Sequence, residues 1–355
     1  PAALFNRAFR TEIERSGQGT ALVIGVERAD GTRSRYETAV FTPEHPWAAY
    51  NKYYVERIVK FLLWQRGGCK VTIGGPPEIG RYIEQAYEPG GEREFDSIFM
   101  GGQVYEHRFE VVSCHPQKVP AAREQAKALG RHLDGCRIGF DLGASDRKVS
   151  AVVEGEVIYS EEVIWEPRKQ TDPGYHYREV MDSLKTAAGK MPRVDAVGGS
   201  SAGIYIENRP MVASLYRGIP EARFGEIKDL FLRIGKEMGV PLEVINDGDV
   251  TALAGSMSLE DNGVLGIAMG SSEAVGYMDS GSRITGRLNE LAFAPVDSSP
   301  AAAVDEWSGD RGVGATYFSQ QAVNRLLPAA GISLPDGAGL PERLVEVQQL
   351  MARGD

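Results

Sequence analysis

Four residues able to do chemistry stand close together near the middle of the chain: Asp141, Gly143, Ser145 and Lys148. The surrounding pattern predicts a strand that ends in an acid, a glycine turn with a hydroxyl, and a second strand over 149–153. Such a turn can direct backbone N–H groups and the Ser145 hydroxyl at one phosphate. Asp141 could hold Mg²⁺ through water, because Mg²⁺ keeps most of its waters and takes one or two carboxylates. An ordinary hairpin without a ligand is the competing interpretation.

A second polar pair, Asn246 and Asp247, follows the apolar segment 242–245 and precedes a helix predicted over 250–258. Asn and Asp are preferred helix caps, so capping alone would explain both residues. The functional interpretation makes Asp247 a general base, because a carboxylate at the carboxyl end of a strand faces the crevice where α/β proteins bind ligands. There it could accept the proton of a hydroxyl that attacks a phosphoryl group.

Two further segments are rich in small residues. A second strand–turn–strand unit is predicted around Gly270, Ser271 and Ser272, where backbone donors and hydroxyls could meet an anion. Residues 198–203, which include Ser201, follow a short predicted strand and form either part of a ligand cleft or a tight crossover. Each segment alone is compatible with an ordinary turn. The turn at Gly270 and the turn at 143–145 flank the Asn-Asp strand end, and this combination favours a phosphate site over two ordinary hairpins.

The composition narrows the class of protein. At 355 residues the chain is long enough for two or three domains, and its 42% hydrophobic and 25% charged residues are typical of a soluble globular protein. The formal net charge of −10 argues against a nucleic-acid partner. The three cysteines include no C-x-x-C pair, which fits reduced thiols in the cytoplasm. No apolar run approaches the roughly 20 residues that a membrane span needs.

Alternating strands and helices predict α/β domains with mixed sheets. In the first 135 residues the predicted elements are strands over 20–28 and 34–41, a helix over 53–65, a strand over 70–73, a helix over 78–87, strands over 95–100 and 105–113, and a helix over 121–133. Beyond them we predict the hairpin from 137 with an extension to 163, helices over 177–188, 224–238, 250–258, 317–327 and 344–351, and strands over 196–199, 242–245, 264–269, 273–278 and near 284.

The order of these motifs resembles the ROK family of sugar kinases and related proteins, within the actin/Hsp70/hexokinase superfamily, over residues 137–325. The resemblance implies an α/β fold of actin-like ATPase (ribonuclease H-like) domains with an additional N-terminal α/β domain. It divides the chain into an N-terminal α/β accessory domain (1–135), a first actin-like domain (136–249) and a second one (250–355), which we expect to be incomplete at its C-terminal end.

By the same resemblance, residues 141–148 match the family's first phosphate loop and residues 264–279 its second. Asp247 matches the catalytic base. The residues that would bind ATP and Mg²⁺ are Asp141, Gly143, Ser145, Lys148, Gly270, Ser271 and Ser272, with Asp141 holding Mg²⁺ through water. The residues that would contact the substrate are Ser201, Asn246 and Glu290, of which Glu290 matches the Glu of the family's Gly-Glu-x-Gly-His motif.

Two departures from the family pattern bear on the substrate. The His of the Gly-Glu-x-Gly-His motif is Phe293 here, and segment 306–315, which matches the family's zinc-binding motif, contains no cysteine. Ala315 stands where the family has a Glu that contacts sugar. We therefore expect no structural zinc, and an acceptor that is less rich in hydroxyls than glucose or is not a sugar.

The sequence thus predicts an ATP-dependent kinase of carbohydrate metabolism, a phosphotransferase with an alcohol group as acceptor, acting on a sugar or sugar-like compound. Its partner would be this small molecule, with no nucleic acid and no membrane, and a homodimer is one assembly that the resemblance allows. Two alternatives stay open. One is a non-catalytic ROK-like protein that senses a sugar or nucleotide, which the loss of the His and zinc motifs favours. The other is an ATPase that acts on something other than a sugar.

Overall fold

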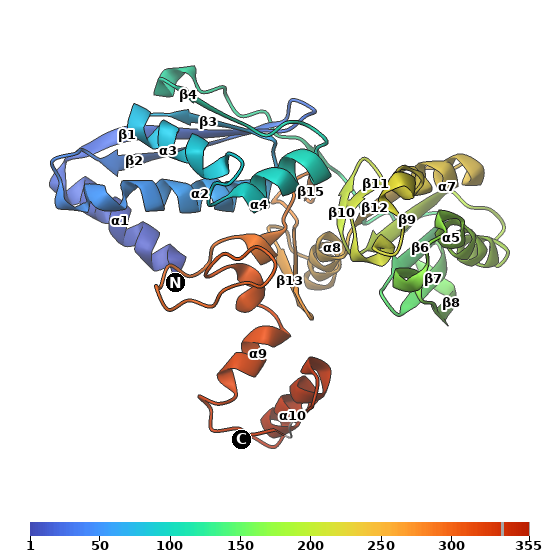
Figure 1. Ribbon diagram of the computed structural model, residues 1–355. Coiled ribbons are helices and arrows are strands. Elements are labelled where there is room, and N and C mark those ends of the chain that lie inside the picture. Colours follow the sequence, from blue (N-terminus) through green and yellow to red (C-terminus); the bar gives the residue numbers. More distant parts are fainter. Residues whose placement is uncertain (335–336, 355) are drawn as a thin grey trace. The chain divides into compact units, whose positions relative to one another are not determined.

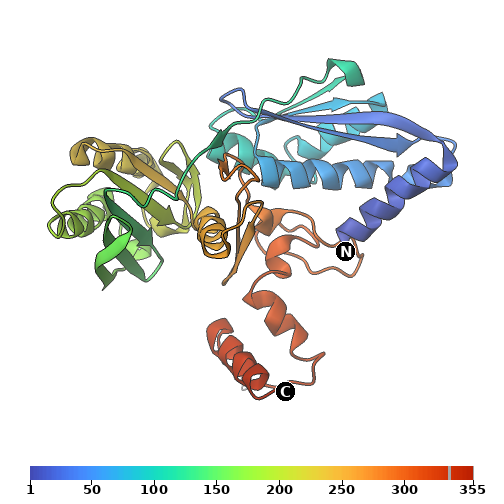
Figure 2. The same cartoon turned by 180° about the vertical axis from the view of Figure 1, so that it is seen from behind.

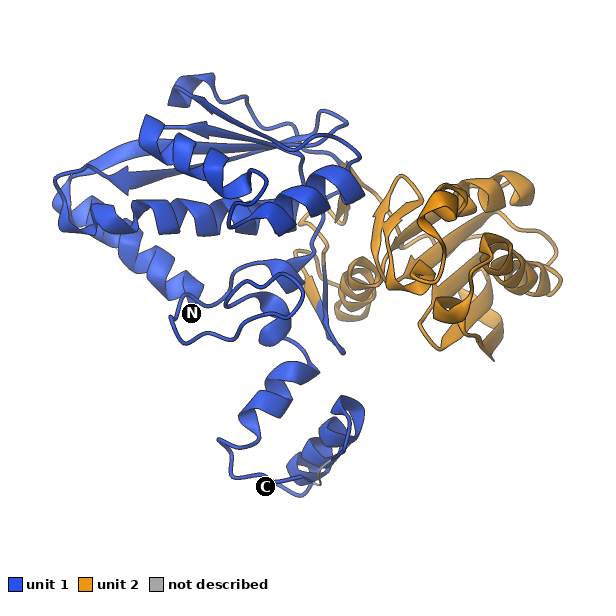
Figure 3. Ribbon diagram, in the orientation of Figure 1, with its two compact units in different colours: residues 1–125, 267–275, 286–355 blue, residues 126–266, 276–285 orange. Residues whose placement is uncertain are grey.

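The computed structural model describes residues 1–334 and 337–354, which form two compact units (Figure 1, Figure 3). Unit 1 comprises residues 1–125, 267–275 and 286–355, and unit 2 comprises residues 126–266 and 276–285. These limits differ from the domain limits expected at 135/136 and 249/250, and the division into three domains stays a prediction.

Unit 1 is built on a four-stranded sheet in the order β2-β1-β3-β4 (Figure 1). Its strands are β1 (Gly19–Glu27), β2 (Arg33–Phe41), β3 (Lys70–Gly74) and β4 (Glu110–Cys114). Strand β1 pairs antiparallel with β2 and with β3, whereas β3 and β4 are parallel. The first three strands confirm the sequence prediction, and β4 is shorter than the strand predicted over 105–113.

Helices α1, α2 and α3 pack against this sheet (Figure 2). The helices of unit 1 are α1 (Ala2–Ser16), α2 (Asn51–Arg66), α3 (Pro77–Tyr87), α4 (Glu94–Ser97), α9 (Gln320–Leu326) and α10 (Leu340–Ala352). Shorter turns are the 3₁₀ helices η1 (Pro46–Tyr50), η3 (Pro116–Lys118), η7 (Leu291–Phe293) and η8 (Gly314–Thr316), and the π-helix η2 (Ile98–Val104). The apolar face predicted for α2 is buried.

Two predictions in the N-terminal part are wrong. Residues 95–100 form helical turns in α4 and η2 instead of a strand, and the rings of Phe95 and Phe99 both pack on Trp64, with centroids 6.2 and 5.0 Å away. Residues four apart meet on one side of a helix, so helical backbone brings both rings to the same partner. The helix predicted over 121–133 is also absent.

Segment 121–133 is extended because its backbone groups form hydrogen bonds with residues distant in the chain. Arg123 exchanges both backbone hydrogen bonds with Arg33 in unit 1, at 2.8 and 3.0 Å. In unit 2 the short strand β5 (Ala126–Lys127) pairs with β15 (Ile284–Thr285). Gly130 and Arg131 have φ angles of 77° and 59°, which a right-handed helix does not allow.

Unit 2 contains a five-stranded mixed sheet in the order β12-β9-β6-β7-β8. Its strands are β6 (Cys136–Leu142), β7 (Asp146–Val153), β8 (Glu156–Ile164), β9 (Ala196–Ser201) and β12 (Leu242–Asn246). The first three form an antiparallel meander, and β9 and β12 add parallel to β6 on its other side. This order and these directions are the topology of the ribonuclease H-like fold, so the predicted fold class and the predicted five-stranded sheet are confirmed.

The helices of unit 2 are α5 (Pro173–Ala188), α6 (Phe224–Lys228), α7 (Leu230–Met238) and α8 (Asp247–Leu259). The single helix predicted over 224–238 is interrupted at Asp229. Three 3₁₀ turns are η4 (Pro167–Lys169), η5 (Ser214–Tyr216) and η6 (Glu221–Arg223). A small hairpin, β10 (Ile204–Ile206) and β11 (Arg209–Val212), follows β9.

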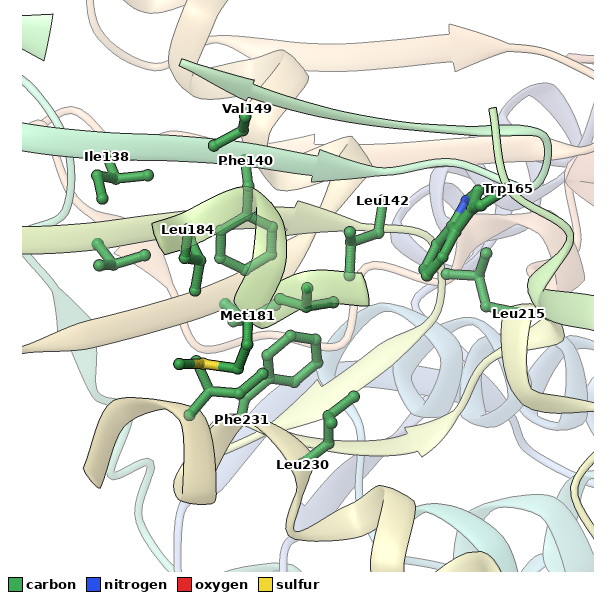
Figure 4. Packing of buried hydrophobic residues seen from close by; sticks show 14 of the residues in the cluster. Ile138, Phe140, Leu142, Val149, Trp165, Met181, Leu184, Leu215, Leu230 and Phe231 are labelled. Atoms are coloured by element: carbon green, nitrogen blue, oxygen red, sulfur yellow. The ribbon is translucent and has the colours of Figure 1, made fainter. Parts of the chain in front are cut away.

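The core of unit 2 lies between the sheet and its helices (Figure 4). Alternate residues of β6, Ile138, Phe140 and Leu142, point into it and are at most 6% exposed. Gly199 must be a glycine there, because a Cβ atom would lie 2.2 Å from the Phe140 ring of the adjacent strand. Part of the small-residue pattern at 198–203 is therefore explained by packing.

The hairpin β13 (Leu265–Met269) and β14 (Glu273–Tyr277) has its tip in unit 1 and its base in unit 2. At the base, Gly266 and Gly276 lie against helix α8. A Cβ atom on Gly276 would lie 2.2 Å from the Gly248 carbonyl oxygen, and one on Gly266 would lie 2.5 Å from the Ala252 nitrogen. These two glycines let the hairpin base approach the backbone of α8.

Candidate functional site

A cleft of about 560 Å³ in unit 2 brings together residues from β6, β7, β8, β9 and α8. Its polar side chains are Asp141, Lys148, Ser150, Ser160, Ser200, Asp247 and Thr251. Asp141 and Asp247, which are 106 positions apart in the sequence (247 − 141), therefore line one cleft.

The pairing of the strands explains why Asp141 faces the cleft. Asp141 lies between Phe140 and Leu142, both of which point into the core, so its own side chain lies on the opposite face of the sheet. In the sheet Asp141 is opposite Lys148 of β7 and Ser200 of β9. Neighbouring residues in register share a face, so these three side chains meet on the cleft side.

Ser201 is placed differently from Ser200. It is fully buried, and its hydroxyl oxygen accepts a 2.7 Å hydrogen bond from the Tyr205 hydroxyl. Ser201 is in register with Leu142, so it lies on the core face of the sheet. The sequence prediction named Ser201 and not Ser200, because only the register of β9 against β6 decides which of the two serines shares a face with Asp141.

Asn246 and Asp247 begin helix α8. The Asn246 side chain accepts a hydrogen bond from the Gly248 N–H at 2.7 Å and donates one to the Gly203 carbonyl at 2.7 Å. Asn246 is therefore the N-cap of α8, as the structural interpretation of this motif expected. Capping orients the first turn of α8, and Asp247 at that turn lines the cleft.

The environment of Asp247 makes its carboxyl a stronger base than an ordinary aspartate. Burial raises the pKa of Asp247; the hydrogen bond from the Gly248 N–H, 3.1 Å long, opposes this rise, and the nearby charge of Asp141 adds to it. A carboxylate whose proton affinity is raised is better suited to accept a proton from a hydroxyl. The backbone carbonyl of Asp247 also accepts a hydrogen bond from the Thr251 hydroxyl at 2.9 Å.

The two proposed phosphate donors near the turn 143–145, Ser145 and Lys148, are both paired with Asp146. The Ser145 hydroxyl donates to Asp146 Oδ2 at 2.8 Å, and Lys148 Nζ lies 2.9 Å from Asp146 Oδ1. Lys148 and then Ser145 lower the pKa of Asp146 through these hydrogen bonds. Trp165 secures the turn, because its Nε1 donates to the Gly143 carbonyl at 2.9 Å. Asp146, which sequence analysis passed over, is therefore the electrostatic partner of both proposed phosphate ligands.

The second predicted phosphate loop lies at the tip of the β13–β14 hairpin, in unit 1. The Gly270 N–H donates to the Ser272 carbonyl at 3.0 Å, and the Gly270 carbonyl accepts from the Gln320 N–H at the start of α9 at 2.9 Å. Ser271 and Ser272 are exposed. The tip is thus a closed turn that presents two hydroxyl side chains to its surroundings.

Glu290 and Phe293 also belong to unit 1. The Glu290 N–H donates to the Trp64 carbonyl at 3.0 Å. The Phe293 ring packs on Trp64, Phe95 and Phe99 with centroid distances of 4.5, 5.6 and 6.2 Å. Phe293 stands where the ROK pattern has a histidine, and here it completes an aromatic cluster with residues of the N-terminal segment.

Segment 306–315 is held by ion pairs centred on Asp310. Asp310 Oδ2 lies 2.8 Å from Arg57 Nη1 and 3.1 Å from Lys60 Nζ, and Asp310 Oδ1 lies 3.0 Å from Arg93 Nη1. Arg57 is also paired with Glu56 at 2.7 Å. We call these five residues the Asp310 cluster; each of their side chains is at most 13% exposed. A buried charge cluster thus fixes the segment that matches the family's zinc motif.

One feature of the sequence indicates the Asp310 cluster. Glu56, Arg57 and Lys60 interrupt the apolar pattern of α2, and their burial shows that these charges face inward. Over residues 1–334 and 337–354, no group of three or more His, Cys, Asp or Glu side chains is arranged to hold a metal ion. In the same part of the chain, no helix has the length and apolar character that crossing a membrane would require.

Comparison with known proteins gives matches among solved structures alone. No family model matches the sequence, and no curated protein matches it. Among the solved structures, a ROK family transcriptional regulator, described as a homologue of the E. coli MLC protein, matches with 20% identity and a TM-score of 0.42. The match covers 60% of this chain and 53% of the regulator, so the chain spans about half of that protein's length.

Two of the other matching structures are sugar kinases by their descriptions. A ROK hexokinase from Thermus thermophilus is 17% identical with a TM-score of 0.44, covering 62% of this chain and 70% of its own. A glucokinase from Parabacteroides distasonis is 14% identical with a TM-score of 0.40, covering 58% and 59%. The ROK names agree with the family that the motifs resemble. With TM-scores below 0.5, the function of this chain is inferred from its own cleft.

Proposed function

We propose that the chain transfers a phosphoryl group from ATP to a hydroxyl of a sugar or sugar-like compound, with Asp247 as the general base. The observation that carries this proposal is the cleft of unit 2, where Asp247 lies with Asp141 of β6 and with the lysine and serines of β7, β8 and β9. A base, a carboxylate able to face a cation, and hydroxyl donors are the groups that such a transfer requires. The net charge of −10 supports a small-molecule acceptor over a nucleic acid.

The proposal gives roles to the predicted site residues. Asp247 accepts the proton of the acceptor hydroxyl, and its raised pKa strengthens that basicity. Asn246 caps α8 and thereby orients the turn that carries Asp247. Ser145 and Lys148 would donate to phosphate oxygens after leaving Asp146. Glu290 stays a proposed acceptor-side residue, and Ser200 of the cleft takes the place of Ser201, whose buried hydroxyl lies on the core face of the sheet.

The metal of the proposal is Mg²⁺. Asp141 offers a carboxylate oxygen in the cleft, which is the donor type that Mg²⁺ takes from proteins, and it would hold the ion through water. When bound, Mg²⁺ supplies charge neutralisation for the phosphate groups. Gly143 positions the turn beside Asp141, and Gly270, Ser271 and Ser272 are the proposed second contact with phosphate.

The direct test is ATP turnover with a panel of hexoses, amino sugars and polyols, for the natural chain and for Asp247→Asn. We expect one class of acceptor to stimulate turnover, and Asp247→Asn to lower the rate by about 10²–10⁴, the usual contribution of a positioned general base. Asp182→Asn is the control, since Asp182 is 76% exposed on α5 and does not line the cleft. An acceptor-stimulated rate unchanged by Asp247→Asn would contradict the assignment of the base.

A second candidate is a protein that binds a sugar or nucleotide without turnover. The pairing of Ser145 and Lys148 with Asp146 favours it, because both donors of the proposed phosphate loop already have a carboxylate partner. Phe293 in its aromatic cluster favours it as well, since it replaces a polar side chain of the family pattern. Saturable binding of ATP or a sugar, without phosphorylated product for any acceptor, would select this candidate.

A further inference from the structure

Unit 1 contains a cavity of about 1050 Å³ that the proposed phosphoryl transfer does not use. One wall is aromatic, with Phe5 from α1, Trp47 and Tyr50 from η1, Tyr53 from α2 and Tyr82 from α3. Trp47, Tyr50 and Tyr53 are 39%, 52% and 37% exposed, so parts of these rings are open to a ligand. Rigid aromatic side chains provide a large contact area at a low cost in conformational entropy.

The Asp310 cluster contributes charged side chains to the same cavity. Glu56, Arg57, Arg93 and Asp310 line it, and Lys60 joins the cluster through Asp310. Lys60 also pairs with Asp96 at 3.0 Å. With Asp96 included, three cations face three carboxylates, and the formal charges of the cluster cancel; Arg311, Glu92 and Asp297 are the other charged residues that line the cavity. The side chains hold one another in place before any ligand arrives, which is the preorganisation that small-molecule sites show.

This charge balance restricts the ligand. A charged ligand would have to compete with the buried pairs, and separating a buried ion pair costs several kcal/mol in general. Hydroxyl groups can add to such a cluster without breaking it, because each donates to a carboxylate oxygen and accepts from a guanidinium N–H. At the rim, Ser298 and Ser299 add further hydroxyl partners. The site therefore suits an uncharged ligand with many hydroxyls and a flat apolar face.

We propose that this cavity binds a neutral saccharide of more than one sugar ring, stacked on Trp47 and Tyr50 with its hydroxyls toward Arg93 and Asp310. A pyranose combines an apolar ring face with hydroxyls at its edge, which matches the aromatic wall and the polar cluster. The volume slightly exceeds the roughly 300–1,000 Å³ that small-molecule sites occupy, so a longer saccharide fills it better than a single ring. The site lies within unit 1, apart from the Asp141–Asp247 cleft of unit 2.

The experiment measures binding to the full chain by titration calorimetry and tryptophan fluorescence, without ATP. The probes are maltotriose, cellotriose and triacetylchitotriose, with trigalacturonate and the protonated glucosamine trimer as charged counterparts. We expect one neutral trisaccharide to bind with a Kd of about 1 mM or tighter and more strongly than its monosaccharide. Trp47→Ala and Tyr50→Ala should each weaken this binding by about tenfold or more, as removal of a central aromatic contact does.

Trp307→Ala is the matched control, because Trp307 is 72% exposed and does not line the cavity. This variant should keep the affinity of the natural chain. Asp247→Asn should also keep it, so loss of phosphoryl transfer and loss of saccharide binding can be told apart. The proposal is overturned if none of the three neutral trisaccharides binds, if a charged trimer binds more tightly, or if Trp47→Ala and Tyr50→Ala leave the affinity unchanged in folded protein.

Discussion

Two groups of acidic side chains, one buried and one half-buried, have opposite surroundings in this molecule. In unit 1, Asp310 contacts Arg57, Lys60 and Arg93 within 3.1 Å. Burial by itself would raise the pKa of Asp310, but the charges of these three cations outweigh it and hold the pKa well below its usual range. In unit 2, burial and the neighbouring Asp141 raise the pKa of Asp247. One carboxylate is neutralised by cations, whereas the other lies beside a second acid.

The contrast separates structural from chemical roles. A carboxylate held by three cations binds protons weakly and serves to join chain segments. A carboxylate with raised proton affinity can take a proton from a substrate, and it does so at a cost to stability because its charge is desolvated. Removing the two negative charges should therefore have effects of opposite sign on the free energy of unfolding.

The largest expected effect is in the Asp310 cluster. Asp310→Ala should lower the free energy of unfolding by about 3–5 kcal/mol, because three buried cations would lose a partner. Chemical denaturation monitored by circular dichroism measures this change. Glu166→Gln is the control, since Glu166 and its partner Lys169 are 59% and 72% exposed, and such a surface pair contributes little. A change for Asp310→Ala no larger than that control would mean that the cluster does not stabilise the fold.

Glu273 tests the comparison with a carboxyl that pairs with no cation among the residues that the structure describes. It is 7% exposed, and within the described part of the chain its Oε2 has no hydrogen-bond partner. Burial raises the pKa of Glu273 from 4.5 to about 7. Below pH 4.5 the folded and unfolded states are both protonated; between 4.5 and about 7 the folded state binds the proton more tightly, so stability falls as pH rises.

Glu273→Gln removes this pH dependence. We expect the variant and the natural chain to have similar stability near pH 4, and the variant to be more stable by on the order of 2–3 kcal/mol near pH 8. Denaturation curves at both pH values measure the difference. A difference that does not grow with pH would show that the Glu273 carboxyl is ionised in the folded protein without cost.

A smaller effect, on nucleotide affinity, is expected at the turn 143–145. Asp146→Asn removes the charge that pairs with Lys148 and Ser145 and that would repel a phosphate. We expect Mg·ATP to bind more tightly by about 3- to 10-fold, which is the size of one exposed charge interaction. Calorimetric titration gives the affinity, with Asp134→Asn as a control for an exposed acid outside the cleft. Weaker binding would indicate that Asp146 itself helps to hold the nucleotide or its metal.

The smallest expected effect is on stability, at Asp247. Asp247→Asn should raise the free energy of unfolding by on the order of 1 kcal/mol or less, because it removes a desolvated charge beside Asp141. The acid's raised pKa means that this gain is present at neutral pH and disappears as the pH falls below the unfolded-state value. Thermal unfolding at pH 7 and pH 3 measures it. A destabilised Asp247→Asn at pH 7 would show that the carboxylate is a structural partner, as in the Asp310 cluster.

Prediction from sequence succeeded where neighbouring residues carry the information. The β6–β7 hairpin and the helix α2 follow from local spacing and turn residues, and both are confirmed. For Asn246, the capping interpretation that the sequence left open agrees with its hydrogen bond to the Gly248 N–H. It failed where partners distant in the chain compete with local preference. Segment 121–133 is rich in helix-forming residues, yet Arg123 pairs with Arg33 and the helix does not form. Segment 95–100 carries Asp96 and Ser97 among four apolar residues and is too short for periodicity to assign it to a strand or a helix.

The sequence by itself determined the residue types of the candidate site and the ends of the strands that carry them. Asp141, Asn246 and Asp247 could be selected because strand alternation and helix capping act over a few residues. Only the tertiary structure showed that Ser200 and not Ser201 faces the cleft. It also showed that Asp146 pairs with both Ser145 and Lys148, and that ion pairs of Asp310 with cations of α2 hold segment 306–315. The physical reason is that electrostatic partners and burial depend on residues far apart in the chain, and folding alone brings these residues together.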